Sequence, residues 1–73
     1  MISKSQIILF IYDELTSKRV IKTNDIIYKY NISSRTFRRY IAEINAYLYN
    51  NYKNECIIYN SDEKCYTLKN TNY

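Results

Sequence analysis

Residues 31–48 read NISSRTFRRYIAEINAYL, and this stretch decides the predicted fold. Apolar residues recur in it at spacings of four, three and four, the stripe of an amphipathic helix: Phe37, Ile41, Ile44 and Leu48. Ser33 predicts the N-cap, because a serine side chain accepts a hydrogen bond from a free N–H group of the first turn. The pattern predicts a helix over Ser34–Leu48, with helical character continuing to about Asn50 or Tyr52.

A shorter helix is predicted just before this one, over about Asn24 to Tyr30. Thr23 is expected to cap it, and Asp25 lies in the first turn, where the helix dipole favours a negative charge. Asn31 is expected to end it, because Asn tolerates left-handed backbone better than other non-Gly residues and this chain has no Gly. Ile32 would then fill the core between the two helices.

Toward the N-terminus, residues 3–18 predict another helix, capped by Ser3 or Ser5. Its apolar face has helical spacing: Ile7, Ile8, Ile11 and Leu15. Residues 20–22 are β-branched in part and are interpreted either as a short strand or as an extended connector.

Toward the C-terminus, residues 56–60 and 65–68 flank a polar four-residue loop and predict a β-hairpin. In the expected register, Asn60 faces Cys65, Tyr59 faces Tyr66 and Ile57 faces Leu68. Alternation then places four residues on one apolar face: Ile57, Tyr59, Tyr66 and Leu68. No disulfide between Cys56 and Cys65 is expected in this register.

Length and composition exclude several classes of function. The 73 residues predict one domain over residues 1–69 and a frayed polar tail over residues 70–73. The absence of Gly excludes glycine-rich phosphate loops, and the absence of His removes imidazole triads and the commonest general base. Two cysteines alone cannot build a four-ligand zinc site. No nucleophile–base pair is visible, so we expect neither an enzyme nor a cofactor.

No stretch has the length of a membrane span, and the N-terminus lacks a signal-peptide pattern. We therefore expect a cytoplasmic protein with no membrane partner and with reduced cysteines.

The net charge of +4 is concentrated in one segment. Residues 20–41 carry five basic residues against Asp25 alone, which accounts for the whole excess: Lys22, Lys29, Arg35, Arg38 and Arg39. A clustered basic patch is typical of a polyanion binder, although a merely solvated helix face would look the same from charge alone.

The helices over residues 24–30 and 34–48 have the spacing of a helix-turn-helix, and the hairpin follows where a wing would stand. Residues 33–41 (SSRTFRRYI), Ile44 and residues 66–68 (YTL) resemble the N-terminal winged helix-turn-helix domain of DeoR-type and WYL-type bacterial transcription regulators. That family's recognition helix reads roughly V-S-x-R-T-I-x-R-D-I-x-x-L, and its wing closes on G-Y-x-L. Tyr40 replaces the family's Asp and Cys65 replaces its wing Gly. No counterpart of the family's ligand-sensing domain is visible, so we expect no small-molecule effector domain.

The fold class expected is therefore mainly α with a small β-hairpin, a winged helix-turn-helix of three helices plus a wing. Nine residues are candidate DNA contacts: Lys22, Thr23, Ser33, Ser34, Arg35, Thr36, Arg38, Arg39 and Lys64.

The candidate contacts have different expected roles. Arg35 and Arg38, three apart on one exposed face, suit bidentate contact with guanine in the major groove. Arg39 would reach a phosphate or pair with Glu43 at i+4. The remaining candidates would contact backbone phosphates, with Ser33 also expected as a plain cap. Lys64 is the weakest, because Asp62 and Glu63 beside it would repel phosphate.

Two functions are predicted. The first is a sequence-specific double-stranded DNA-binding transcriptional regulator, with Ser34–Leu48 in the major groove. Palindromic operators would require a homodimer, formed through the first helix, the end of the third or the tail. The alternative is a phage or mobile-element protein-interaction or inhibitor module that uses the same scaffold to bind a protein partner.

Overall fold

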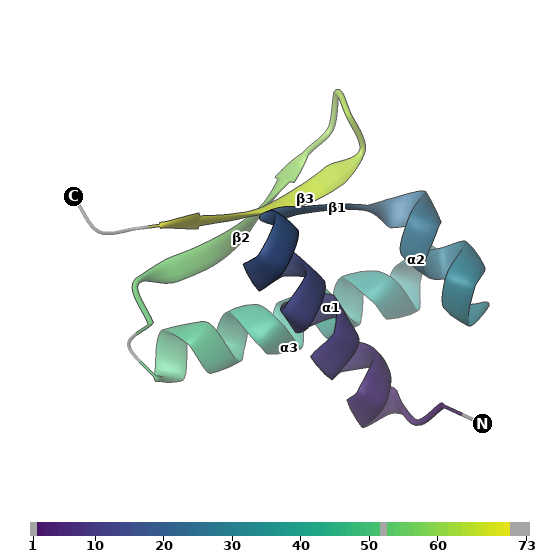
Figure 1. The fold of residues 1–73 in the computed structure, drawn as a ribbon, viewed down its shortest axis with the longest axis horizontal. Helices are drawn as coiled ribbons and strands as arrows, with labels where there is room; N and C mark the ends of the chain where they lie inside the picture. The colour runs from purple at the N-terminus through teal and green to yellow at the C-terminus, as the bar shows by residue number, and fades with distance from the viewer. Residues whose placement is uncertain (1, 52, 71–73) are drawn as a thin grey trace.

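The computed structural model describes residues 2–51 and 53–70, which form three helices and a three-stranded antiparallel sheet (Figure 1). The elements follow in the order α1 (Lys4–Lys18), β1 (Val20–Lys22), α2 (Thr23–Tyr30), α3 (Ser34–Asn50), β2 (Glu55–Asn60) and β3 (Cys65–Asn70). No helix of these residues is long and apolar enough to cross a membrane.

The first helix begins where the serine caps were expected. Ser3 is the N-cap of α1: its side chain accepts a hydrogen bond from the Gln6 N–H, and the Gln6 side chain accepts one from the Ser3 N–H, both at 3.2 Å. This reciprocal pair is a capping box. At the other end Arg19 adopts a left-handed conformation, with φ of 67°, and its N–H donates to the Leu15 carbonyl oxygen at 2.9 Å.

The second helix differs from the prediction at its start. Thr23 is the first helical residue of α2, and Lys22 is the N-cap with no side-chain hydrogen bond. The prediction that Thr23 caps this helix was therefore wrong: its backbone is already helical, and its N–H donates to the Lys64 carbonyl oxygen of the hairpin instead. The end of α2 is as predicted, because Asn31 is left-handed at φ 53° and ψ 48°.

The third helix begins and ends at predicted residues. Ser33 is its N-cap, accepting a hydrogen bond from the Thr36 N–H at 3.1 Å, and its last residue is Asn50. Tyr52, the other predicted limit, lies outside the described residues.

The sheet contains one strand more than the predicted hairpin. Its order is β1-β3-β2, so β3 is central and β1 pairs with it in the register Ile21 to Tyr66. Of the two alternatives for residues 20–22, the structure shows the strand.

The hairpin register itself is confirmed. Asn60 faces Cys65, Tyr59 faces Tyr66 and Ile57 faces Leu68. Both cysteines are free, as expected. Strand β3 extends to Asn70, where the frayed tail was predicted to begin, and residues 71–73 lie outside the described part of the chain.

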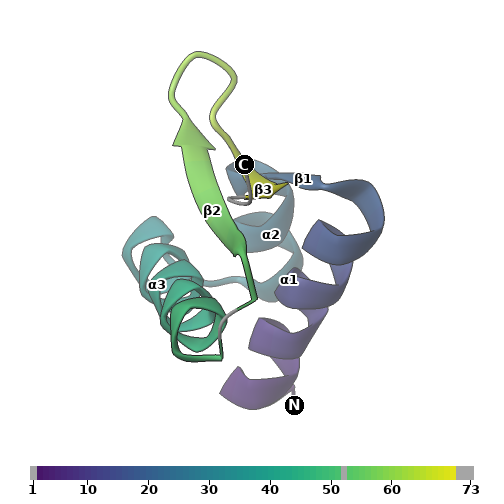
Figure 2. The same ribbon diagram turned by 90° about the vertical axis from the view of Figure 1, so that its left-hand side faces the viewer.

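The core lies between the helices and one face of the sheet. Figures 1 and 2 show α1 and α3 on the same side of the strands. The largest of the most deeply buried side chains come from α1, α3 and β3: Ile11, Leu15, Phe37, Leu48 and Leu68. The predicted apolar hairpin face is buried at Ile57, Tyr66 and Leu68, but Tyr59, next to the last residue of β2, is 48 % exposed.

One polar contact joins α3 to the hairpin. The Asn45 side chain accepts a hydrogen bond from the Ile57 N–H at 2.8 Å and donates one to the Ile57 carbonyl oxygen at 3.3 Å. This pair of bonds fixes the outer edge of β2 against the middle of α3.

Candidate nucleic-acid interface

The three arginines of α3 are all exposed, near the N-terminal end of the helix. None of them pairs with a carboxylate among the described residues. The ion pairs among the described residues involve other cations: Lys4 pairs with Glu43 at 3.1 Å, Lys18 with Glu14 at 3.1 Å, and Arg19 with Glu55 at 3.3 Å.

Their position is unfavourable for the helix itself. The first turn of α3 contains no acidic residue, and Arg35 lies in it. The N-terminus of a helix carries a partial positive charge, so a cation there is disfavoured and an anion is favoured. Arg35 and Arg39 are also like charges at i and i+4, which repel each other. Helix stability therefore does not explain this cluster.

Glu43, the alternative partner expected for Arg39, forms an ion pair with Lys4 of α1 instead. The Lys4 ammonium group also lies 5.9 Å from the centre of the Tyr40 ring. Arg39 is therefore left on the exposed face with Arg35, one helical turn apart.

The hydroxyls at the start of α3 divide between two roles. The Ser33 hydroxyl accepts from the Thr36 N–H and donates to the Thr36 hydroxyl oxygen at 3.0 Å, so these two candidates serve the cap. Ser34, in contrast, is exposed and makes no hydrogen bond through its side chain with any described residue.

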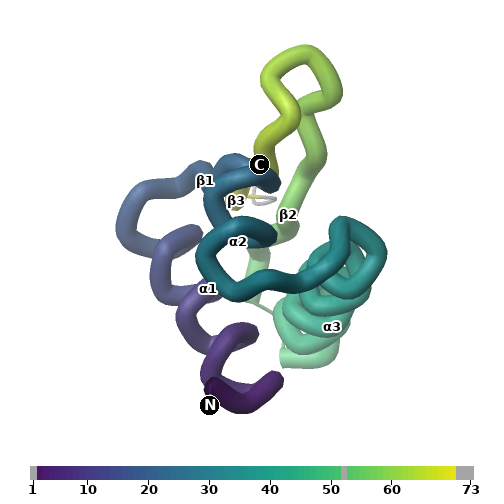
Figure 3. Tube along the Cα trace, turned by 90° about the vertical axis from the view of Figure 1, so that its right-hand side faces the viewer, coloured from purple at the N-terminus to yellow at the C-terminus, as the bar shows by residue number. Residues whose placement is uncertain are grey.

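A hollow lies between the starts of α2 and α3 and the hairpin. It brings together three predicted candidates and two tyrosines: Thr23, Ser34, Arg38, Tyr59 and Tyr66. In Figure 3 the hairpin rises on the side of α3, away from α1, so the helix and the hairpin border one face of the molecule.

The two tyrosines in the hollow are packed as a group. The Tyr66 ring contacts Phe37 edge-on at 5.4 Å between ring centres and Tyr59 at 4.9 Å. Burial raises the pKa of Tyr66, and Tyr59 raises it further, whereas the nearby positive charge of Arg38 lowers it. The net shift is upward, so the Tyr66 hydroxyl stays protonated at neutral pH and can donate a hydrogen bond.

Two predicted contacts lie away from this face. Lys22 pairs with Cys65 in the sheet, and strand alternation turns the exposed Lys22 side chain to the opposite face from the buried Ile21. There it lines a separate hollow with Asp25 and Glu63. Lys64, left-handed at φ 53°, stands at the hairpin tip next to the exposed Glu63. The structure thus groups Lys22 and Lys64 with acidic neighbours rather than with the arginines.

The tyrosines of the hollow were not among the predicted site residues. The register that places Tyr59 opposite Tyr66 was predictable, and it would have indicated two aromatic side chains on one face. Their proximity to Arg38 depends on how α3 packs on the sheet, for which the sequence contains no local signal.

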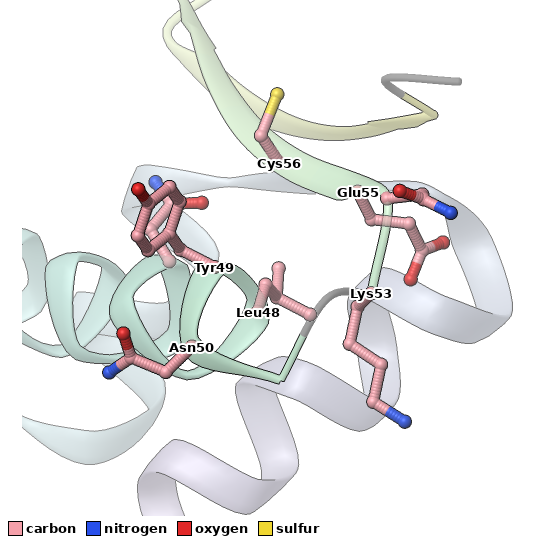
Figure 4. A pocket seen from close by; sticks show the side chains of 8 residues that line it. Leu48, Tyr49, Asn50, Lys53, Glu55 and Cys56 are labelled. Carbon is pink, nitrogen blue, oxygen red and sulfur yellow. The ribbon is translucent and has the colours of Figure 1, made fainter.

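Two other concave surfaces lie outside this face. One, at the corner between α3 and β2, is lined in part by Leu48, Tyr49, Lys53 and Cys56 (Figure 4). The other is an apolar groove between α1 and α3, lined by Ile8, Leu9, Tyr12, Glu43, Ile44 and Tyr47. The described residues contain no group of three or more Cys, Asp or Glu side chains that could hold a metal ion.

Comparisons of the chain with protein-family models, with curated proteins and with solved structures found no match. A functional proposal for this chain therefore depends on the residues and the geometry described above.

Proposed function

We propose that this protein is a sequence-specific double-stranded DNA-binding transcriptional regulator with a winged helix-turn-helix fold. In this proposal α2 and α3 are the helix-turn-helix, α3 is the recognition helix in the major groove, and the β2–β3 hairpin is the wing. The protein would act in the cytoplasm, as a homodimer if its operator is palindromic.

The observation that carries the proposal is the unpaired arginine cluster at the start of α3. Arg35, Arg38 and Arg39 are exposed and unpaired among the described residues, and Arg35 lies in the first turn, where the helix dipole disfavours a cation. The left-handed Asn31 between α2 and α3 provides the tight turn that a helix-turn-helix needs. The resemblance of residues 33–41 to DeoR-type and WYL-type regulators supports the same assignment.

Within the cluster, Arg35 and Arg39 are proposed to read base edges. They lie four residues apart and so share a face of α3, and that face is on the far side of the helix from Phe37 and Ile41. The exposed Ala42 and Ala46 continue this face. Small side chains there allow the helix to approach the groove floor closely, and alanine can contact a thymine methyl group.

Selection from a random duplex pool, followed by sequencing, tests this function. We expect enrichment of a short motif, and a palindromic motif would indicate a dimer. For the selected duplex, Arg35→Ala should weaken binding by about 1–3 kcal/mol, the typical value of one bidentate base contact. An unenriched pool, together with no duplex binding at micromolar protein, would contradict the proposal.

The second candidate function is a phage or mobile-element module that binds a protein partner. Two observations favour it: the hairpin tip carries Asp62 and Glu63, and the groove between α1 and α3 exposes apolar surface, with Leu9 65 % exposed. The same selection separates the two functions, because this module would leave the pool unenriched.

A further inference from the structure

The hollow between α2, α3 and the hairpin has a composition that the recognition helix alone does not explain. Each of its five side chains carries a hydrogen-bond donor, in the form of four hydroxyls and one guanidinium, and none is a carboxylate. None of the five side chains makes a hydrogen bond with another described residue. A concave group of hydroxyl donors around a guanidinium, with no carboxylate, suits an anion.

Tyr66 is the most constrained of these donors. Only 8 % of its surface is exposed, and its ring is held by Phe37 and Tyr59. Its side chain lines the hollow, and its hydroxyl has no hydrogen-bond partner among the described residues. The hydroxyl oxygen is not itself fully buried, so an external acceptor can reach it and form a hydrogen bond.

Thr23 also lines this hollow. Its hydroxyl oxygen is buried and has no hydrogen-bond partner among the described residues. The helix that begins there, α2, also lacks a side-chain cap, unlike α1 and α3. Its acidic first-turn residue, Asp25, lines the hollow on the other side with Lys22.

We propose that this hollow binds a phosphate group, with Arg38 supplying the charge and the hydroxyls of Tyr66, Tyr59 and Ser34 supplying hydrogen bonds. Its biological occupant is a phosphodiester of the duplex backbone. This identity of the occupant rests on the proposed function and deepens it, because it separates Arg38 from Arg35 and Arg39. Arg38 then positions the protein on the backbone without reading sequence, whereas the sequence pattern predicted a base contact for it.

The binding of inorganic phosphate by the free protein tests the site without DNA. The probe is titrated against chloride at matched ionic strength, and the backbone amide resonances are followed by NMR. We expect saturable shifts at Thr23, Ser34 and Tyr66. Tyr66→Phe, which removes one hydroxyl and keeps the ring, should weaken the affinity by about threefold or more, as expected for the loss of one hydrogen bond.

Tyr28→Phe is the matched control, because Tyr28 is 80 % exposed on α2 and does not line the hollow. It should bind phosphate as the unchanged protein does. Equal affinity of Tyr66→Phe and Tyr28→Phe would overturn the site, as would shifts spread over all basic residues without saturation.

Duplex binding then distinguishes failure of the site from failure of the proposed function. Tyr66→Phe should weaken the selected duplex and an unrelated duplex by the same factor, and Arg38→Ala should also reduce the salt slope by about one. Localised phosphate binding without any duplex binding would retain the site but reject its DNA occupant. If Tyr66→Phe leaves duplex binding unchanged, the phosphate site is rejected, whereas the proposed function as a DNA-binding regulator is not.

Discussion

Helices α1 and α3 both carry basic residues, but these residues differ in whether they form ion pairs. The cations of α1 and its C-cap are paired with carboxylates: Lys4 with Glu43, Lys18 with Glu14, and Arg19 with Glu55. Lys18 also lies in the last turn of α1, where the helix dipole favours it. The arginines of α3 have no such partner among the described residues and lie at the disfavoured end. The difference teaches that the positive charge of α1 is neutralised by ion pairs, whereas that of the three arginines of α3 is not.

A single charge reversal on each helix gives the largest expected contrast. Arg35→Glu and Lys18→Glu change the net charge equally. Arg35→Glu should weaken binding of the selected duplex by at least about tenfold, since it removes a base contact and adds repulsion. Lys18→Glu should change affinity much less, because Lys18 is paired and lies on α1. Fluorescence anisotropy at one salt concentration measures both; equal losses would mean that only total charge matters.

Substitution of the two N-cap serines compares how much each cap stabilises its helix. Ser33→Ala should lower the free energy of unfolding by about 1 kcal/mol, because the Thr36 N–H loses its acceptor. Ser33→Gly should lower it by only a few tenths of a kcal/mol. Urea denaturation measures the change, and Ser3→Ala in α1 is the parallel variant. A Ser33→Ala protein as stable as the parent would show that the cap contributes nothing.

The same charge reversals should have opposite effects on stability. Arg35→Glu should raise the free energy of unfolding by about 0.3–1 kcal/mol, because it places an anion at a helix N-terminus. Lys18→Glu should lower it by a similar amount, because it places an anion at a C-terminus and removes the pair with Glu14. Thermal denaturation without DNA reveals the signs, and a stabilising Lys18→Glu would contradict the comparison.

The smallest effects concern two tyrosines, one near an acid of α1 and one near a base of α3. Burial and then Glu14 raise the pKa of Tyr30, whereas Arg38 lowers the raised pKa of Tyr66. Glu14→Gln should therefore bring the Tyr30 pKa closer to its ordinary value, and Arg38→Ala should raise that of Tyr66. Titration of the tyrosine ring carbons by NMR measures both, and each variant serves as the control for the other.

These shifts also determine how stability depends on alkaline pH. A raised pKa means that the folded protein holds the phenolic proton more tightly than the unfolded chain does. The stabilisation is complete below the ordinary tyrosine pKa of about 10 and is lost as pH rises through the folded-state pKa. Tyr66→Phe should reduce this loss, as measured by urea denaturation across the alkaline range.

Local features of the fold were predictable from the sequence because they depend on neighbouring residues. Ser33 as a cap, Asn31 as a left-handed residue and the hairpin register each follow from short-range chemistry. The pairing of β1 with β3 was not predictable, because Val20 and Thr67 are far apart in sequence and three residues carry little strand pattern. The Thr23 cap failed for a related reason, since the hairpin carbonyl of Lys64 fixes the start of α2.

The candidate site also contains residues that were predictable from the sequence and residues that were not. The arginines of α3 could be selected from charge and helical spacing. The hollow around Tyr66 could not, because its residues come from α2, α3, β2 and β3 and meet only after packing. Lys22 was adjacent to Thr23 in sequence, yet the pleat of β1 turns it to the other face.

The two hydrogen bonds between Asn45 and Ile57 have a consequence for behaviour at high concentration. Strand β2 is at an edge of the sheet, and an open edge is a template on which a second chain can add a strand and start aggregation. The Asn45 amide occupies the outward N–H and carbonyl groups at the middle of that edge, as a neighbouring strand would. One side chain of α3 thus removes the hydrogen-bonding groups that an added strand would need at the middle of this edge.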